Sequence, residues 1–314
     1  MTLNGKKIVV TGGAGFLGSY VIKELIRKGA SPSHITIPRS KEYDLREKEI
    51  CMIITKHADI LIHLAGNVGG IGKNRSHPAD LFYDNILMGA HLIHSAQVNK
   101  VKKVILIGTI CAYPKFTPVP FQEDNLWLGY PEETNAPYGL AKKMLLVGAD
   151  AYRAQYGLKS IYLLLVNLYG PGDNFDPQSS HVIPALIRKI YEAKKHKQKQ
   201  IVVWGDGTPT REFIYAEDAA RAIVTATETY TNSHPVNIGS GKEISIKDLV
   251  QLISDIIGYK GKIRWDSSKP NGQPRRLLDT SRANKEFGFV ATTDFLNGLK
   301  KTIHWYEKAY GKNI

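Results

Sequence analysis

The chain has 314 residues, of which 43% are hydrophobic and 23% are charged. This composition excludes a disordered or fibrous protein, and the length predicts about two domains or lobes. The formal charge of +13 permits anionic partners, but the densest basic run, residues 192–200, lacks interleaved aromatic side chains, so we interpret it as a solvated helix end and expect no nucleic-acid partner.

The sequence shows no signal of secretion or of membrane insertion. The apolar run near the N-terminus is too short for a signal peptide, and no stretch of about 18 apolar residues occurs. The two cysteines, Cys51 and Cys111, cannot form a disulfide framework, and their separation fits no metal site. We therefore expect a cytoplasmic protein with no bound metal and no membrane partner.

Short apolar runs rich in Val and Ile alternate along the chain with longer stretches of helical periodicity. Strands are predicted at residues 7–10, 34–37, 59–65, 103–108, 161–166, 200–204 and 236–239, and helices at about 16–29, 45–57, 78–98, 137–156, 181–196, 216–230 and 245–257. Strands that are nearly all apolar are typical of a parallel sheet covered by helices on both faces. The pattern predicts an α/β fold with a doubly wound parallel sheet.

Beyond about residue 170 the loops lengthen and become rich in Gly, Pro and Asn, as in YGPGDNFDPQSSH and SSKPNGQPRRLLD. Long ordered loops more often carry ligands than merely connect elements. We therefore predict a dinucleotide-binding Rossmann domain over residues 1–170, to which later segments at about 200–240 contribute. Residues 171–314 are predicted to form mainly a smaller substrate-binding lobe.

Three glycines follow the first predicted strand. The run TGGAGFLG places Gly12, Gly15 and Gly18 between a strand and a helix. Glycines in this position allow a tight turn, let backbone N–H groups approach a pyrophosphate and let the helix pack close to the strand. The helix N-terminus adds a favourable field for negative charge. The motif in this context predicts a dinucleotide site.

The end of the second predicted strand bears on the choice of dinucleotide. An acidic residue there would bind the ribose 2′-OH of NAD, but this chain reads ITIPRSKEYD. Arg39 and Lys41 could neutralise the 2′-phosphate of NADP, although Glu42 lies close by and both can also be plain surface charges. NADP is favoured and NAD remains possible. Asp44 can accept a hydrogen bond from adenine or cap the next helix.

A tyrosine and a lysine lie four residues apart in the segment NAPYGLAKK. Tyr138 and Lys142 share one face of a predicted helix that Pro137 opens. A protonated lysine beside a phenol favours the phenolate, which can exchange a proton with a carbinol or carbonyl oxygen near neutral pH. The same spacing occurs in many helices without a function, but its position downstream of a dinucleotide loop favours a catalytic pair.

Together these motifs carry a resemblance to a known family. TGGAGFLG, LAG at residues 64–66, PYGLAKK and NLYGPGDNF resemble the extended short-chain dehydrogenase/reductases of the nucleotide-sugar epimerase/dehydratase group. GNVGGI, CAYPKF, SHVIPALIRK, VVWGDGTPTREF and KPNGQPRRLLD further resemble the GDP-L-fucose synthase branch of that group. The resemblance implies a 3,5-epimerase and NADPH-dependent 4-reductase of GDP-4-keto-6-deoxymannose, and a homodimer formed through paired long helices.

The resemblance also assigns catalytic roles. It implies a reductive set of Thr109, Tyr138 and Lys142, with Cys111 and His181 as the acid/base pair of epimerisation. A thiol suits proton exchange at a carbon next to a ketone, because an ordinary thiol has a pKa of about 8.5. The alternatives are a small buried core cysteine for Cys111 and a helix cap or surface residue for His181.

Two sets of binding residues are implied as well. The cofactor set comprises Gly12, Gly13, Ala14, Gly15, Phe16, Leu17, Gly18, Arg39, Asp44, Leu64, Ala65, Gly66, Ile107, Lys142, Asn167, Leu168 and His181. The substrate set, for a small nucleotide-sugar molecule, comprises Asn167, Lys189, Trp204, Arg211 and Asn271. Arg211 can grip a diphosphate with two N–H groups, and Trp204 offers a flat wall. Arg275 and Arg276 can add to the same anion site, although one of them can be a surface charge only.

Departures from the group bear on the expected activity. Sugar-nucleotide 4,6-dehydratases carry an Asp-Glu pair where this chain has Ile110 and Cys111, so dehydration is not expected. Thr109 replaces the usual serine, and Ala14 stands where the bacterial synthase tends to have an arginine, which weakens the case for NADP. Two alternatives stay open: a nucleotide-sugar 4-epimerase with tightly bound NAD, and a non-catalytic dinucleotide-sensing protein.

Overall fold

Six parallel strands form the central sheet of the structure. The computed structural model describes residues 1–269 and 271–311. The sheet has the order β2-β1-β3-β4-β5-β9, and every neighbouring pair is parallel. Its strands are β1 (Ile8–Thr11), β2 (Ile35–Thr36), β3 (Ile60–His63), β4 (Lys103–Thr109), β5 (Ser160–Leu165) and β9 (Val236–Ile238). The predicted doubly wound parallel sheet is confirmed.

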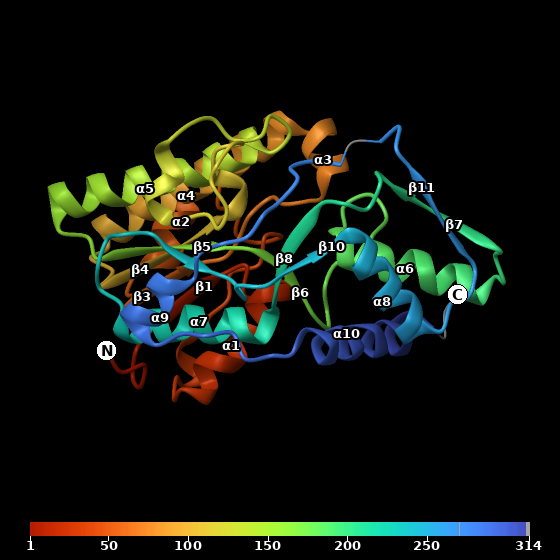
Figure 1. Ribbon diagram of the computed structural model, residues 1–314. Coiled ribbons are helices and arrows are strands. Elements are labelled where there is room, and N and C mark those ends of the chain that lie inside the picture. The colour runs from red at the N-terminus through yellow and green to blue at the C-terminus, as the bar shows by residue number, and fades with distance from the viewer. Residues whose placement is uncertain (270, 312–314) are drawn as a thin grey trace.

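Helices cover both faces of this sheet (Figure 1). One layer contains α2 (Lys48–Thr55), α4 (Pro78–Val98) and α5 (Ala136–Tyr156), and the other contains α1 (Phe16–Arg27), α7 (Ala216–Thr229) and α9 (Ser281–Phe287). Every residue of β3, β4 and β5 is buried between the layers. This double burial explains why the strands are apolar without alternation.

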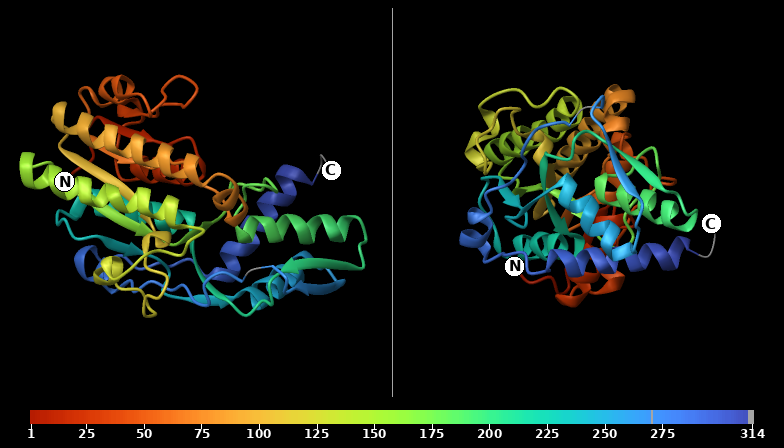
Figure 2. Two further views of the ribbon diagram at one scale, coloured as in Figure 1. Left: turned by 90° about the horizontal axis from the view of Figure 1, so that it is seen from above. Right: turned by 45° about the vertical axis from the view of Figure 1, so that its right-hand side comes forward.

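Later segments form a smaller second part beside the sheet (Figures 1 and 2). It contains the parallel pair β7 (Gln200–Trp204) and β11 (Lys262–Asp266), and the three-stranded sheet of β10 (Glu243–Ser245), β8 (Thr210–Tyr215) and β6 (Asn167–Tyr169). Its helices are α6 (Val182–Lys195), α8 (Ile246–Ile257) and α10 (Phe295–Tyr310). The apolar side chains of this part form their own cluster, distinct from the core around the central sheet.

The sequence pattern locates the central elements and misses several others. The strand predicted at residues 200–204 forms, but it pairs with β11 in the second part instead of joining the central sheet. The pattern does not predict β6, β8, β10, β11, α9 or α10. It also misses the short helix α3 (Ile71–Ser76) and the 3-10 helices η1 (Pro32–His34), η2 (Ile110–Ala112) and η3 (Glu123–Trp127).

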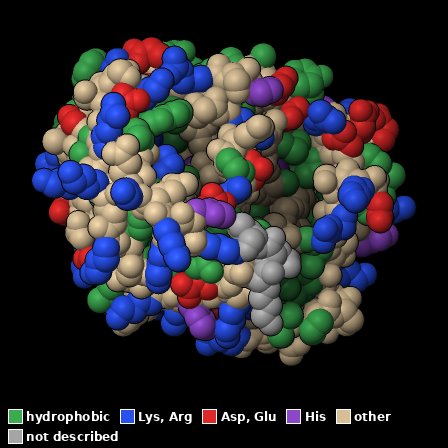
Figure 3. All heavy atoms as spheres, turned by 90° about the vertical axis from the view of Figure 1, so that its right-hand side faces the viewer, with side chains coloured by type: hydrophobic (Ala, Val, Ile, Leu, Met, Phe, Trp, Pro, Cys, Tyr) green, Lys and Arg blue, Asp and Glu red, His purple; other side chains and the backbone are tan. Residues whose placement is uncertain are grey.

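The positive charge is dispersed on the face of the molecule that Figure 3 shows. On the face in Figure 3, Lys and Arg side chains are spread out and do not gather in one patch. Within residues 1–269 and 271–311, no helix has the length and apolar character needed to cross a membrane. The same part of the chain holds no group of three or more His, Cys, Asp or Glu side chains that could bind a metal ion.

A buried lysine ties the sheet to a helix layer. Lys103 opens β4 and is 5% exposed, and its Nζ donates to the main-chain oxygens of Ala226 (3.1 Å), Thr227 (2.5 Å) and Tyr230 (2.6 Å). These oxygens lie at the C-terminal end of α7, where carbonyls lack helical partners and a positive charge is favourable. Burial, with a smaller contribution from the charge of Arg153, lowers the pKa of Lys103 to about 8.

We predict that Lys103→Met lowers the free energy of unfolding by about 1–3 kcal/mol, because three buried carbonyl groups lose their donor. Urea unfolding followed by circular dichroism measures the change. Lys102→Met is the matched control, since Lys102 is exposed and pairs with Asp59 at the surface (2.7 Å). Equal losses in the two variants would contradict the role assigned to Lys103.

Candidate functional site

A cleft of about 1390 Å³ opens at the carboxyl ends of the central strands. The turns after β1, β3 and β4 line it, together with α5 and segments of the second part. All the predicted catalytic, cofactor and substrate residues border this cleft except Gly13, which is buried within its turn. Ligands of open parallel sheets bind at this edge.

The glycine turn after β1 is shaped by close approach of main chain. Gly12 has a φ of +72°, and a Cβ there would lie 2.7 Å from the backbone N of Ala65. A Cβ at Gly18 would overlap the oxygen of Gly12. No side chain caps α1, so the N–H groups of its first turn have no side-chain acceptor. The turn therefore leaves both the space and the donors that a pyrophosphate requires.

The turn after β2 places one of the two predicted basic residues in the cleft. Arg39 is exposed and borders the cleft, whereas Lys41 does not. Asp44 also borders it, but Glu47 occupies the N-cap of α2. The capping alternative for Asp44 is wrong, because its carboxylate instead accepts from the backbone N of Arg46 (3.0 Å) and pairs with that guanidinium (2.7 Å).

Tyr138 and Lys142 lie on α5, and Thr109 lies at the end of β4. Burial raises the pKa of Tyr138, a negative charge on Cys111 would raise it further, and a hydrogen bond with Thr109 acts in the opposite direction. Burial also lowers the pKa of Lys142 to about 8. The phenol is therefore protonated at neutral pH, which differs from the phenolate that the pair alone predicts. A protonated phenol can donate to a carbonyl oxygen.

The sulfur of Cys111 lies between an amide and a guanidinium. Asn135 Oδ1 is 3.8 Å from Sγ, and Arg276 Nη1 is 3.7 Å from it. The backbone N of Cys111 donates to Thr109 Oγ1 (3.2 Å) at the start of η2. Cys51, in contrast, is fully buried, and burial raises the pKa of its thiol to about 12. Cys111 is thus the thiol that polar groups surround in the cleft.

His181 directly precedes α6 and faces the same cleft. It occupies the N-cap position, but its side chain makes no capping hydrogen bond. The imidazole is exposed to the cleft, and the surrounding protein lowers its pKa by desolvation. The capping alternative is wrong, and a neutral imidazole in this place can accept a proton.

The predicted substrate residues line the part of the cleft formed by the second part of the molecule. They are Asn167, Lys189, Trp204, Arg211 and Asn271. Arg211 donates from Nη1 to the main-chain oxygen of Gln273 (2.7 Å) and from Nη2 to that of Asn271 (3.2 Å). Burial, and then the charge of Arg276, lowers the pKa of Arg211 to about 10. An anionic ligand would relieve the repulsion between these two guanidinium groups.

Several cleft residues were not identified from the sequence. They are Arg46, Asn67, Asn74, Asp84, Glu132, Asn135, Asp173 and Gln273. Burial raises the pKa of Asp173 to about 7, and its Oδ2 has no hydrogen-bond partner among the described residues. Glu132 and Asn135 stand just before the segment PYGLAKK, and this proximity is the one signal that could have identified them.

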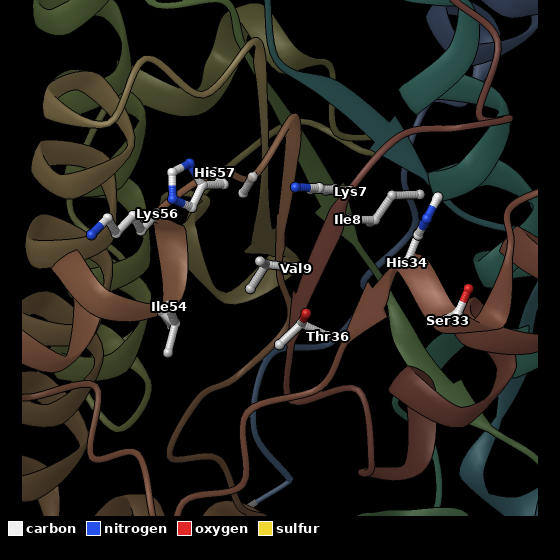
Figure 4. Close-up of a pocket in the computed structure, with 10 residues that line it drawn as sticks. Lys7, Ile8, Val9, Ser33, His34, Thr36, Ile54, Lys56 and His57 are labelled. Atoms are coloured by element: carbon white, nitrogen blue, oxygen red, sulfur yellow. The ribbon is translucent and has the colours of Figure 1, made fainter.

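A second cavity, of about 150 Å³, lies at the opposite edge of the sheet (Figure 4). The starts of β1 and β2 and the end of α2 line it, with Lys7, Thr36 and His57 among its residues. None of the predicted site residues borders it. Since ligands of parallel sheets bind at the carboxyl ends of the strands, the large cleft is the candidate site.

Comparison with known proteins places the chain among nucleotide-sugar enzymes. The model of the NAD dependent epimerase/dehydratase family matches residues 8–239. GDP-L-fucose synthase 1 of Arabidopsis thaliana is 38% identical to the chain, over 98% of this chain and 95% of that protein. The GDP-L-fucose synthase of Sinorhizobium fredii is 40% identical, over 96% of this chain and 95% of that protein.

The solved structures include a similar fold with a bound dinucleotide. A GDP-L-fucose synthetase from Naegleria fowleri bound to NADP superposes with a TM-score of 0.89 at 27% sequence identity. The match covers 99% of this chain and 97% of that one. The likeness therefore extends over both parts of the molecule and over the cleft between them.

We predict that Gly12→Ala weakens binding of a nicotinamide dinucleotide by about tenfold or more, because the positive φ and the contact with Ala65 force the turn open. Calorimetric titration measures the affinity. Gly5→Ala is the control, since Gly5 has a similar φ of +69° but no atom lies within 4 Å of the added carbon. Similar affinities in both variants would show that the close approach does not shape the site.

Proposed function

The chain belongs to the NAD dependent epimerase/dehydratase family, and from this premise we propose that it epimerises a GDP-4-keto-6-deoxy sugar at C3 and C5 and reduces its 4-keto group. More broadly, the protein is a GDP-sugar epimerase/reductase that uses NADPH. The observation that carries the finer proposal is the shared cleft of Thr109, Cys111, Tyr138, Lys142 and His181. A dinucleotide sensor would need none of these side chains.

The residues around the glycine turn fit NADPH. The space that a Cβ at Gly12 would fill, and the uncapped first turn of α1, accommodate the pyrophosphate. Arg39, exposed at the rim, supplies positive charge for the 2′-phosphate. When bound, NADPH supplies the hydride that reduces C4.

Tyr138 supplies the proton that reduction requires. Its phenol is protonated at neutral pH because burial raises its pKa, so it can donate to the 4-keto oxygen as negative charge develops there. Thr109 hydrogen-bonds the phenol and orients it. Lys142, buried beside the cleft, contributes positive charge that favours the resulting phenolate.

Cys111 and His181 carry the epimerisation. The 4-keto group acidifies the C–H bonds at C3 and C5, because the electron pair left behind is delocalised onto the ketone oxygen. One of the two side chains removes a proton, and the other returns a proton to the opposite face of the carbon. No net oxidation occurs in this half of the reaction, so it does not consume the hydride. It precedes reduction, because reduction removes the ketone that acidifies these C–H bonds.

The substrate lies against the second part of the molecule in this proposal. Arg211 grips the diphosphate, with Lys189 adding charge, and Trp204 stacks against a ring because 56% of its surface is exposed. Asn167 and Asn271 bind sugar or phosphate oxygens. In this proposal residues 171–314 bind mainly the substrate and residues 1–170 bind the dinucleotide, while α7 and β9 from the later segment complete the helix layer and the sheet around it.

The protein is proposed to act as a cytoplasmic homodimer. Large apolar side chains are exposed on the two long helices α4 and α5, namely Phe82, Tyr83, Met144 and Val147. An apolar surface of this kind supports pairing of these helices with a second copy. The unpaired Cys51 and Cys111 suit a reducing compartment.

We predict that Tyr138→Phe slows reduction by about 10²–10⁴-fold while leaving NADPH affinity nearly unchanged, because only the proton donor is lost. NADPH oxidation is followed by absorbance, and affinity by fluorescence titration. Tyr152→Phe is the matched control, since Tyr152 lies on the same helix and bonds His94 (3.0 Å) away from the cleft. Native rates in the Tyr138 variant would end this assignment.

Solvent exchange separates epimerisation from reduction. In D₂O without NADPH, the native protein should exchange the C3 and C5 protons of the ketone, and Cys111→Ser and His181→Gln should each lose this exchange. Both variants should still oxidise NADPH, because Thr109 and Tyr138 remain, although more slowly if the ring is misplaced. Cys51→Ser serves as the control thiol. Exchange at the native rate in both variants would contradict the proposed acid/base pair.

A further inference from the structure

The two neighbours of the Cys111 sulfur differ in what they can do. The Arg276 guanidinium, whose Nη1 lies 3.7 Å from Sγ, can only donate hydrogen bonds. The amide oxygen of Asn135, 3.8 Å from Sγ, can only accept. A thiolate therefore finds its partner in Arg276, and a thiol finds its partner in Asn135. Each protonation state of the sulfur has one group that suits it.

The orientation of the Asn135 amide follows from its other bonds. Its Oδ1 also accepts from Asn74 Nδ2 (2.9 Å), and its Nδ2 donates to the Glu132 carboxylate. The reverse orientation would place two donors against each other and an oxygen against a carboxylate. The oxygen of Asn135 is consequently the atom that faces the sulfur. Asn74, which completes the arrangement, is only 6% exposed.

The Arg276 side chain is held equally firmly. It is 9% exposed, and its Nε donates to Gln273 Oε1 (2.5 Å), while Gln273 Nε2 donates to the main-chain oxygen of Lys115 (2.7 Å). The main-chain oxygen of Arg276 accepts from the backbone N of Glu212 (3.2 Å). These bonds hold the guanidinium so that one N–H points at the sulfur. Among the described residues, Arg276 forms no ion pair with a carboxylate.

Charged groups surround the sulfur from three sides of the cleft. Arg276 lies in the segment after β11, and its Nη1 contacts the sulfur. Arg211 lies in β8, and a charge on Cys111 is one of the smaller influences on the pKa of Arg211. Glu132 reaches the sulfur only through Asn135, and Tyr138 on α5 faces it as a neutral phenol. Arg276 is the charged side chain that contacts the sulfur directly.

We propose that Arg276 is a positioning residue for epimerisation: it holds the Cys111 sulfur as a thiolate. This thiolate removes a proton from the carbon beside the ketone, and the oxygen of Asn135 then accepts a hydrogen bond from the new S–H. The C–H bond breaks, the S–H bond forms, and the electron pair passes to the ketone oxygen as an enolate. His181, once it has accepted a proton from water, delivers that proton to the opposite face and restores the C–H bond, and both side chains then re-equilibrate with water. This inference rests on the proposed function.

The test measures alkylation of Cys111 by iodoacetamide, a neutral reagent, in a Cys51→Ala background without sugar nucleotide. At neutral pH, Arg276→Gln should slow alkylation by about tenfold or more, and Arg276→Lys should recover most of the rate. At a pH of about 10, where an accessible thiol is ionised without help, native and variant rates should converge. Arg275→Gln is the matched control, since Arg275 is exposed and pairs with Glu243 outside the cleft.

Two results would overturn the proposal. One is alkylation of Arg276→Gln at the native rate at neutral pH, and the other is an equal slowing at neutral and alkaline pH, which marks altered access to the sulfur. If Arg276→Gln does not fold, Arg276→Lys decides, because a loss of about tenfold with the charge retained contradicts a role for that charge.

Deuterium exchange from the ketone then separates this inference from the function on which it rests. A slowed exchange in Arg276→Gln, matching its slowed alkylation, supports both. If alkylation depends on Arg276 as expected but Cys111→Ser still exchanges deuterium, the contact between Arg276 and the sulfur stands and the acid/base role of Cys111 fails. If alkylation is independent of Arg276 but Cys111→Ser loses exchange, the positioning role of Arg276 fails and the proposed function stands.

Discussion

The common direction of the central strands determines where the rest of this molecule can act. Because β1, β3 and β4 are parallel neighbours, their carboxyl ends meet at one edge, and the turns that follow them are forced together there. The turns after β1 and β3 approach each other at Gly12 and Ala65, where a side-chain carbon has no room. The proposed dinucleotide end of the cleft is thus built from main chain, and the proposed catalytic side chains lie next to it, with Thr109 at the end of β4 and Cys111 just beyond.

Burial of charged groups is the second feature that shapes the cleft. Glu212 is fully buried in β8, and its carboxylate accepts from the backbone N of Gly241 and of Leu278 (2.7 Å each). Burial raises its pKa to about 7, and these main-chain donors offset part of the cost of desolvation. The bond from Leu278 attaches the segment that carries Arg276 to β8. Strand β8 therefore connects the second part of the molecule to the thiol near the end of β4.

What the sequence could predict depended on how local each signal was. The glycine turn and the pair of Tyr138 and Lys142 are encoded within a few residues, so their positions in the cleft follow from the pattern. The contact between Arg276 and Cys111 joins residues 165 positions apart, and no periodicity reports it. Asp44 shows that even a local signal can mislead. The sequence allows Asp44 to cap the next helix, but its carboxylate pairs with the guanidinium of Arg46, and α2 begins later in the chain.

The late elements were missed for a related reason. Strands β6 and β10 have only three residues each, and their pairing with β8 comes from tertiary contact, which a short apolar run does not reveal. Helix α10 carries a cap signal, since Asp294 accepts from the backbone N of Asn297 (3.0 Å), but its apolar face packs on the second cluster, which the sequence does not locate. Long-range packing, and not propensity, decides these segments.

The central claim is that one cleft carries both inversion of the sugar and reduction of its ketone. The most direct measurement is NMR analysis of the product formed from GDP-4-keto-6-deoxymannose and NADPH, with NADPH oxidation recorded in the same sample. The account predicts a product inverted at both C3 and C5 and reduced at C4, with NADPH consumed in equal amount. A product reduced at C4 with C3 and C5 unchanged, or inversion with no NADPH consumed, would contradict it.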